Sequence, residues 1–415
     1  MCKLSWFTCC ALTSIAILWL TGCEMPWNDV TNPAPTDSTV DGYFEAFAAS
    51  SLGEPFARLA PDELARFDAG SDEFAEVDTI AEGLGPVFNE ASCATCHTGP
   101  VGGTNNRLET RFGRIVAGAF DPMVTAGGSL IQDHAIGKVG DPPTYEFVAE
   151  AVPGDATIRA SRITTPLFGL GLVDAVPDEE LLRLANLQAT RTPATAGSPS
   201  LVLEISSGHM RVGRFGWKAQ VPTLHQFSGD AYLNEMGVTN PEFPDENCPQ
   251  GDCAALAHNP VPGLNNDGAA VAAFTDFMTL LAPPARSRTS SLVVEGSGMF
   301  VRVGCADCHT PVLVTGPSPV DALSHRVFRP FSDFLLHDMG SLGDSIVQGS
   351  ATGSQMRTAP LWGVRTRTAL LHDGRAATID AAIRAHDGQG RLARDLFLGL
   401  GSRARVALLA FVNSL

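Results

Sequence analysis

Two five-residue stretches decide the fold of this chain: Cys93-Ala-Thr-Cys96-His97 and Cys305-Ala-Asp-Cys308-His309. Both have the pattern C-x-x-C-H, which is the attachment sequence of c-type haem. The two cysteines bond to the edge of the porphyrin, and the adjacent histidine ligates the iron. A zinc site would need a second ligand pair at short spacing, and a redox dithiol would not need the histidine. The sequence therefore predicts two covalently bound haem c groups.

Each haem motif follows an apolar segment and is followed, much later, by an amphipathic helix. The apolar segments are residues 80–89 and 291–303, and the closing helices are residues 271–281 and 406–415. A helix that enters the haem motif and a closing helix packed against it make the minimal cytochrome c arrangement. We therefore expect a mainly α fold, with two cytochrome c-like domains and long loops.

The domain bounds that we expect are residues 43–284 and 285–415, the first enlarged by insertions. A short internal repeat supports the duplication, because Arg162-Ile-Thr-Thr-Pro-Leu-Phe-Gly169 matches Arg357-Thr-Ala-Pro-Leu-Trp-Gly363. The surplus of the first domain lies mainly between His97 and Arg162 and around residues 190–213. Within the latter, Val202, Leu203 and Ile205 are candidates for a short strand or hairpin.

The N-terminus has the composition of an export signal over residues 1–22, with an apolar stretch from Trp6 to Leu20. Leu20-Thr-Gly-Cys23 resembles a bacterial lipobox, so Cys23 is the expected lipid anchor. An ordinary secretory signal or an uncleaved anchor helix is the alternative. Residues 23–42 predict a flexible tether. Glu24, not Asp, follows the cysteine, so we expect an outer membrane lipoprotein on the periplasmic side or at the cell surface.

The charge balance limits the classes of partner that the protein is expected to bind. The 415 residues contain 28 Lys and Arg against 45 Asp and Glu, a net charge of −17. Such a deficit argues against nucleic-acid binding, which needs clustered cations. It favours basic or neutral small redox partners, and contact with a membrane only through the lipid anchor.

Two further cysteines, Cys248 and Cys253, flank Pro-Gln-Gly-Asp in a turn-rich segment. In an oxidising compartment they predict a local disulfide, with free thiols as the alternative.

These residues together resemble the bacterial di-haem cytochrome c peroxidases and the related MauG-type enzymes, which oxidise protein side chains. The sequence motifs are most similar to those of a branch described as di-haem oxidoreductases, also called thiol oxidoreductases. The resemblance covers about residues 43–415, and its phrases include Gly83-Leu-Gly-Pro-Val-Phe-Asn-Glu-Ala-Ser-Cys93, Gly213-Arg-Phe-Gly-Trp-Lys-Ala219, Asn234-Glu-Met-Gly-Val-Thr239 and Leu335-Leu-His-Asp-Met-Gly340.

The resemblance implies the second axial ligand of the C-terminal haem. In the family it comes from the helix after the phrase His-Asp-Gly, which is His372-Asp-Gly374 here. That helix brings His386 to the position where typical peroxidases have Met and MauG-type enzymes have Tyr. Met356 is the runner-up ligand, and His372 is expected to be structural. A second imidazole lowers the reduction potential relative to a thioether.

The resemblance also makes the first haem the reactive one. By order along the chain, Trp217 would carry electrons between the haems, Gln226 would orient peroxide, and Glu235 would act as acid and base. His225 could take the place of Gln226, and His134 is a candidate cap on the first haem. The alternative is that Glu235 is a surface carboxylate and Trp217 a core anchor.

The expected function is therefore reduction of hydrogen peroxide at the N-terminal haem, with electrons from a small redox protein relayed through the C-terminal haem. The alternatives are a MauG-like, peroxide-driven oxidation of a partner, and a di-haem cytochrome that only transfers electrons. The family often holds Ca2+ between its domains, although no run of ligands for it is recognisable here.

Overall fold

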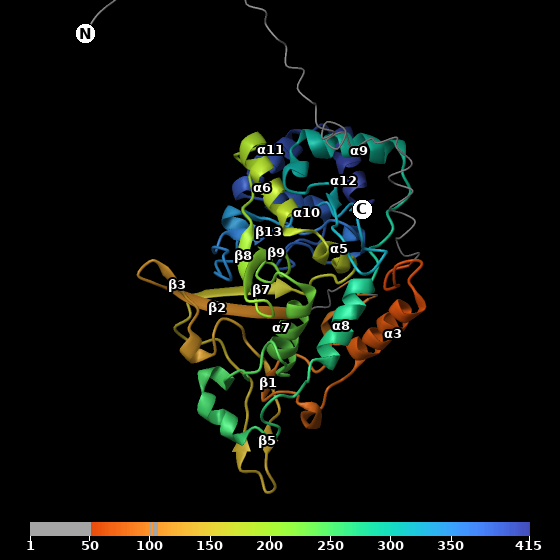
Figure 1. Ribbon diagram of the computed structural model, residues 1–415. Coiled ribbons are helices and arrows are strands. Elements are labelled where there is room, and N and C mark those ends of the chain that lie inside the picture. Colours follow the sequence, from red (N-terminus) through yellow and green to blue (C-terminus); the bar gives the residue numbers. More distant parts are fainter. Residues whose placement is uncertain (1–50, 100, 103–106) are drawn as a thin grey trace, which may run out of the picture.

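The computed structural model describes residues 51–99, 101–102 and 107–415 (Figure 1). The signal segment 1–22, the anchor Cys23 and the tether 23–42 that the sequence predicts lie outside these residues. None of the helices in the described part of the chain has both the length and the hydrophobicity that a membrane span requires.

Helices pack in two pairs, α3 against α8 and α9 against α12 (Figure 1), and the first helix of each pair contacts a haem motif. Both predicted closing helices are present, and α9 is the predicted entering helix of the second motif. The helices are α3 (Pro61–Ala75), α4 (Cys93–Cys96), α5 (Leu170–Asp174), α6 (Asp178–Arg191), α7 (Leu224–Met236), α8 (Ala269–Leu280), α9 (Ser291–Arg302), α10 (Ile379–Ala385), α11 (Arg391–Gly399) and α12 (Ser402–Val412).

The segment before the first haem motif is not the helix that its apolar character predicts. Residues 80–89 form a 3-10 turn (Ile80–Glu82) and the short strand β1 (Val87–Phe88). Gly83 has a φ of 104°, a left-handed conformation that ends the turn, and Pro86 cannot donate a helical hydrogen bond. The entering role falls to α3, which begins at Pro61, the favoured first position of a helix.

Short strands make up much of the rest, so the expected mainly α fold is wrong. Helices account for 36% and strands for 16% of the structure, and the strands form several small sheets. Most strands lie in the two insertions. In the first insertion the sequence shows no regular alternation of apolar and polar residues, and β2 buries only two adjacent residues. The remaining strands are β2 (Leu108–Val116), β3 (Ala119–Asp121), β4 (His134–Ala135), β5 (Lys138–Val139), β6 (Tyr145–Glu146), β7 (Ile158–Ile163), β8 (Ser200–Glu204), β9 (His209–Gly213), β10 (Leu313–Val314), β11 (Val327–Phe328), β12 (Leu336–Asp338) and β13 (Gln355–Arg357).

Two of these pairings matter for the haem sites. β7 pairs antiparallel with β2, so that Arg162 lies opposite Glu109. β8 and β9 form the hairpin that Val202 and Leu203 indicated, with Ser200 opposite Gly213. The predicted disulfide is also present, between Cys248 and Cys253.

The two halves meet where the repeated phrase Pro-Leu-aromatic-Gly occurs. A Cβ on Gly169 would lie 2.8 Å from the ring of Trp362, and a Cβ on Gly363 would lie 2.6 Å from the ring of Phe168. Both glycines have a positive φ, which favours glycine there for a second reason. Each copy of the phrase thus receives the aromatic ring of the other. The exact domain bounds stay a prediction.

Candidate haem sites

The first haem motif forms one helical turn, α4, at the wall of a cavity of about 160 Å³. Cys93, Cys96 and His97 all line this cavity, and both cysteines are free thiols. Burial raises the pKa of both thiols to about 12. A reactive dithiol has the opposite property, a lowered thiol pKa. The motif therefore fits haem attachment better than it fits a redox dithiol.

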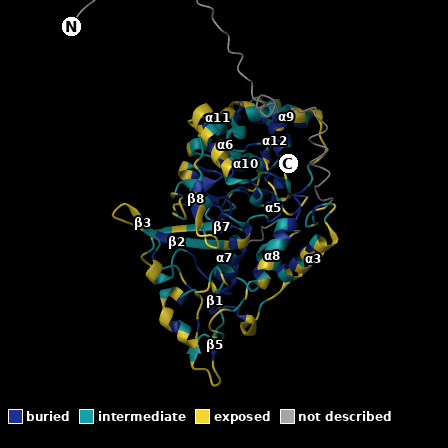
Figure 2. Ribbon diagram, in the orientation of Figure 1, coloured by how far each residue is buried: buried dark blue, intermediate teal, exposed yellow. Residues whose placement is uncertain are grey.

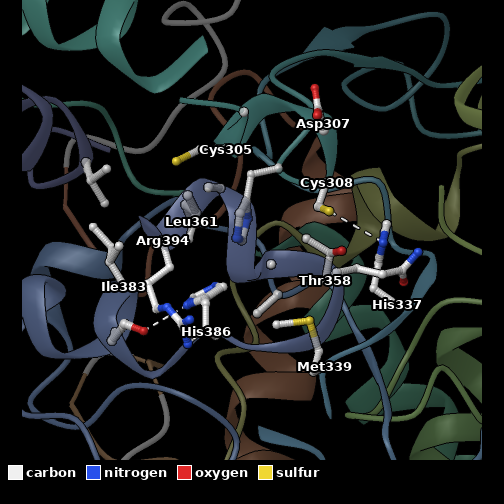
Figure 3. A pocket seen from close by; sticks show the side chains of 18 of the residues that line it. Cys305, Asp307, Cys308, His337, Met339, Thr358, Leu361, Ile383, His386 and Arg394 are labelled. Atoms are coloured by element: carbon white, nitrogen blue, oxygen red, sulfur yellow. Dashed lines mark hydrogen bonds between the residues drawn. The ribbon is translucent and has the colours of Figure 1, made fainter. Parts of the chain in front are cut away.

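The second motif lies in a larger cavity of about 480 Å³, shown in Figure 3. Its thiols, those of Cys305 and Cys308, are also free. His309 donates from Nδ1 to the backbone carbonyl of Phe331 at 3.0 Å, which leaves its Nε2 without a proton. This tautomer is the one that a haem iron requires of its proximal histidine, because Nε2 is then the ligating atom.

A second imidazole faces His309 across this cavity. The ring centres of His309 and His386 are 6.5 Å apart. Nδ1 of His386 contacts the carbonyl of Ala382 at 2.8 Å, so its Nε2 is also free to ligate (Figure 3). A metal between two imidazoles, at about 2 Å from each nitrogen, separates the ring centres by roughly 6 Å. The pair therefore fits an iron held by two histidines.

Buried arginines in the same cavity fit the two carboxylates that haem carries. Arg367 has two buried guanidinium nitrogens, Nε and Nη2, without a hydrogen-bond partner in the described structure. Arg357 donates only to backbone carbonyls, those of Gly216 and Thr358. Burial lowers the pKa of both arginines to about 10. Buried cations without carboxylate partners are costly, so an anionic group at this position stabilises the site.

Trp217 connects the two sites, because its side chain lines both cavities. Its Nε1 donates to the backbone carbonyl of Ile163 at 2.9 Å, and its ring centre lies 6.3 Å from that of His372. Met356 packs in the same small apolar cluster as Trp217 and also lines the second cavity. The structure thus brings together the predicted relay residue and both candidate ligands of the second haem.

Glu235, near the end of α7, lines the first cavity. Its Oε2 accepts a hydrogen bond of 2.8 Å from the side chain of Asn89. Burial, and then repulsion by Glu109, raise the pKa of Glu235 to about 7, against the opposing effects of Asn89 and Arg111. A carboxyl group that titrates near neutrality can both accept and donate a proton under physiological conditions.

Gln226 does not reach either cavity. Its side-chain amide donates to the carbonyl of Leu203 and accepts from the backbone N–H of Ile205, which ties α7 to the β8–β9 hairpin. Both Gln226 and Glu235 lie on α7, about two and a half turns apart, and therefore on opposite faces of the helix. The expectation that Gln226 orients peroxide is not supported by this placement. His225, its alternative, is exposed on the surface.

The other histidines lie apart from the first cavity or have other partners. His134 is exposed on β4 and stacks on Phe88, so it does not cap the first haem site in this arrangement. His337 pairs with Asp333 at 2.8 Å, and its Nδ1 lies 3.4 Å from the sulfur of Cys308. The side chain of Asp338 accepts from the backbone N–H of Gly340.

Sequence reasoning missed the charged side chains that surround Glu235. Glu109 and Arg111 come from β2 and bind each other. Arg162, from β7, binds Asp344, and Asp230 lies on the cavity face of α7. Burial raises the pKa of Asp230 to about 6. Asp230 carried a signal because it lies on the same helix as Glu235, and Arg162 because it begins the first copy of the repeated phrase. Glu109, Arg111 and Asp344 belong to no motif that the sequence showed.

No cluster of three or more His, Cys, Asp or Glu side chains in the described part of the chain could hold a metal ion.

Comparison with known proteins gives one family and several distant structures. A family described as "Di-haem oxidoreductase, putative peroxidase" matches residues 146–415, a range that begins after the first haem motif. No curated protein matches the chain. Hydrazine synthase of Kuenenia stuttgartiensis is 13% identical, over 99% of this chain and 100% of that one, with a TM-score of 0.38. The diheme peroxidase BthA of Burkholderia thailandensis is 15% identical, over 86% of each chain, with a TM-score of 0.40. A MauG-like protein associated with microbial copper homeostasis is 16% identical, over 60% of this chain and 89% of that one, with a TM-score of 0.31.

Proposed function

The chain belongs to the di-haem oxidoreductase family of peroxidase-like enzymes, and from that premise we propose that it reduces hydrogen peroxide at the N-terminal haem with electrons relayed through the C-terminal haem. The reaction consumes one peroxide, two electrons and two protons, and yields two waters. A small redox protein would supply the electrons one at a time.

Each set of site residues has a distinct task in this proposal. Two thiols and one histidine of each motif hold a covalent haem: Cys93, Cys96 and His97 the first, and Cys305, Cys308 and His309 the second. Bound haem supplies an iron that can bind peroxide and exchange single electrons. His386 is the second ligand that we propose for the C-terminal haem, with Met356 as the runner-up.

Glu235 moves the proton. It takes a proton from one oxygen of peroxide and gives it to the other, so that the O–O bond breaks with water as the leaving group. Asn89 holds the carboxylate in place through the hydrogen bond at 2.8 Å. A pKa of about 7 leaves the group able to perform both halves of the transfer.

Trp217 provides the contact between the two sites, since its ring lines both cavities. Its hydrogen bond to the carbonyl of Ile163 fixes the orientation of the indole. The ring therefore offers a fixed aromatic step for electrons that pass from the C-terminal site to the N-terminal site.

The observation that carries the proposal is the chemical difference between the cavities. The larger cavity presents a second imidazole, that of His386, opposite His309. The smaller cavity presents a carboxyl group of raised pKa, and its described lining contains no histidine other than His97. The larger cavity therefore suits an iron with two histidine ligands, and the smaller cavity suits proton transfer next to an iron.

The optical and EPR spectra of the purified di-haem protein test this assignment. We expect one high-spin and one low-spin ferric haem, together with turnover of peroxide when a donor is present. Two low-spin haems that ignore peroxide and small ligands, even after partial reduction, would contradict the proposal.

A MauG-like reaction is the second candidate, in which peroxide drives the oxidation of a partner protein or small substrate. The observation that favours it is the imidazole of His386, because ligation by two histidines lowers the potential of a haem and makes its oxidised states easier to reach. Incubation with peroxide in the absence of a donor distinguishes the two. Oxidation that is shared by both haems and persists supports this candidate, and rapid decay at the first haem alone supports the peroxidase.

We also propose that the protein is an outer membrane lipoprotein on the periplasmic side, anchored through Cys23, with the cell surface as the alternative. Export supports covalent haem attachment and the disulfide alike. Mass spectrometry of the N-terminal peptide tests this, since an acylated Cys23 is expected, and an unmodified Cys23 or an intact signal would contradict it.

A further inference from the structure

The net charge of −17 conceals an uneven distribution along the chain. Residues 285–415 contain 14 Arg and no Lys against ten Asp and Glu, a net charge of +4. Residues 1–284 contain 14 Lys and Arg against 35 Asp and Glu, a net charge of −21. The half that surrounds the second haem motif is therefore the basic half of an acidic protein, and its field differs in sign from that of the whole.

Two of these arginines lie at the edge of the larger cavity. Arg302, at the end of α9, lines the cavity and is exposed, and Arg391, at the start of α11, is exposed beside a lining residue. Neither makes an ion pair with any residue that the structure describes. The exposed Arg384 and Arg403, in contrast, are paired with Asp380 and Glu295.

The carboxylates near this edge are already engaged. Asp395 and Asp387 both face Arg394, at 2.8 Å and 3.8 Å, and Asp387 also accepts from Ser341. Asp307 accepts a hydrogen bond from Thr195. The local surplus of positive charge therefore falls on Arg302 and Arg391.

An apolar strip on α11 continues from these arginines. Leu392 and Leu396 lie one helical turn apart, line the cavity, and are 62% and 46% exposed. Figure 2 shows α11 and α9 at the same end of the molecule, with exposed residues on both. Exposed apolar side chains rimmed by charges are typical of sites that bind another protein.

We propose that the surface formed by Arg302, Arg391, Leu392 and Leu396 docks the electron donor, and that this donor is a small redox protein with an acidic face. The proposal rests on the direction of electron flow given above. It reverses the expectation from the net charge, because the partner meets the field of the nearby surface before that of the distant acidic half. In each encounter the donor loses one electron and the C-terminal haem gains it, so two encounters serve one peroxide.

Mitochondrial cytochrome c in two forms provides the probe. The native form is basic, and the form with succinylated lysines is acidic on the same scaffold. The ferrous probe is mixed with the ferric holoprotein and an excess of peroxide in a stopped-flow instrument, and oxidation of the probe is followed across a range of salt concentrations, with peroxide as the final electron acceptor. Isothermal titration calorimetry with the ferric probe measures binding without electron transfer.

The acidic probe should reduce the protein at least about tenfold faster at low salt, and salt should remove the difference. Arg302→Glu and Arg391→Glu should each weaken its binding and slow its reaction, by about tenfold when combined. The matched control is Arg288→Glu, an exposed arginine outside both cavities that changes the net charge equally. It should alter either quantity by less than about twofold.

A faster reaction with the native, basic probe would overturn the proposal, as would a loss in Arg288→Glu equal to that in the cavity-edge variants. If a small-molecule donor sustains peroxide turnover but no charge preference appears, the docking surface fails and the proposed function stands. If calorimetry shows the charge preference but peroxide is not reduced, the docking surface stands and the proposed function fails.

Discussion

Replacing Glu235 by Gln removes one carboxyl group from the first cavity, which Glu109 and Asp230 also line, while keeping the shape of the side chain and its ability to accept from Asn89. Glu235 is chosen because its carboxyl group lines the cavity of the first haem motif and its pKa is raised from 4.5 to about 7. The raised pKa has two consequences that the substitution tests. Ionisation of Glu235 lowers the stability of the fold, and the ionised carboxylate speeds proton transfer.

The sign of the stability effect follows from the direction of the shift. The folded protein binds the Glu235 proton more tightly than the unfolded chain does, so this contribution is fully present below pH 4.5 and is lost as the pH rises through about 7. At about 1.4 kcal/mol per pH unit, the loss approaches about 3 kcal/mol if the site does not relax, and rearrangement of Glu109 and Arg111 lowers it. Glu235→Gln should escape this loss, and its advantage should grow from pH 4.5 to pH 8.

Urea denaturation of the holoprotein at a series of pH values, followed by far-UV circular dichroism, measures the first consequence. Stopped-flow reaction with peroxide measures the second. The wild-type rate should rise through about pH 7, because the ionised carboxylate accepts the proton. Glu235→Gln should be about 100-fold slower and independent of pH in this range.

Glu246→Gln is the matched control. Burial raises the pKa of Glu246 to about 7 as well, yet this residue lines neither cavity. Like Glu235→Gln, Glu246→Gln should become more stable than the wild type as the pH rises. Its peroxide rate should equal that of the wild type. Equal peroxide kinetics in Glu235→Gln and the wild type would remove Glu235 from the mechanism, and parallel stability curves would refute a carboxyl group held protonated by the fold.

Three further substitutions test the remaining assignments. His386→Ala should convert the low-spin signal of the second haem to high-spin in the EPR spectrum; a surviving methionine-type spectrum would identify Met356 as the ligand. Trp217→Phe keeps an aromatic ring but loses the donor to the carbonyl of Ile163, and it should slow electron transfer between the haems in stopped-flow measurements without altering either haem spectrum; an unchanged rate would place the electron path elsewhere. Gln226→Ala should leave two backbone groups of the β8–β9 hairpin unpaired and cost about 1–3 kcal/mol in urea denaturation, with no change in peroxide kinetics; a slower peroxide reaction would return Gln226 to the active site.

Several site residues were identifiable from the sequence because the fold carries them on short, ordered segments. His386 follows a helix that begins at a capping Thr378, and one turn of that helix sets its hydrogen bond to Ala382. Glu235 and Trp217 keep their order along the chain in the family that the sequence resembles. The strands of the first insertion, in contrast, were missed because all but β2 and β7 are only two or three residues long, and the burial pattern of β2 shows no alternation.

Local spacing alone determined the haem motifs and the disulfide. Two thiols and an imidazole within one helical turn, or two cysteines five residues apart, are within covalent reach whatever the rest of the chain does. Only the tertiary structure decided which polar groups share a cavity. It turned Gln226 away from the site that Glu235 lines, placed Trp217 in the lining of both cavities, and brought Arg302 and Arg391 to one edge. These arrangements depend on helix faces and long-range packing, which fix positions that no interval along the sequence specifies.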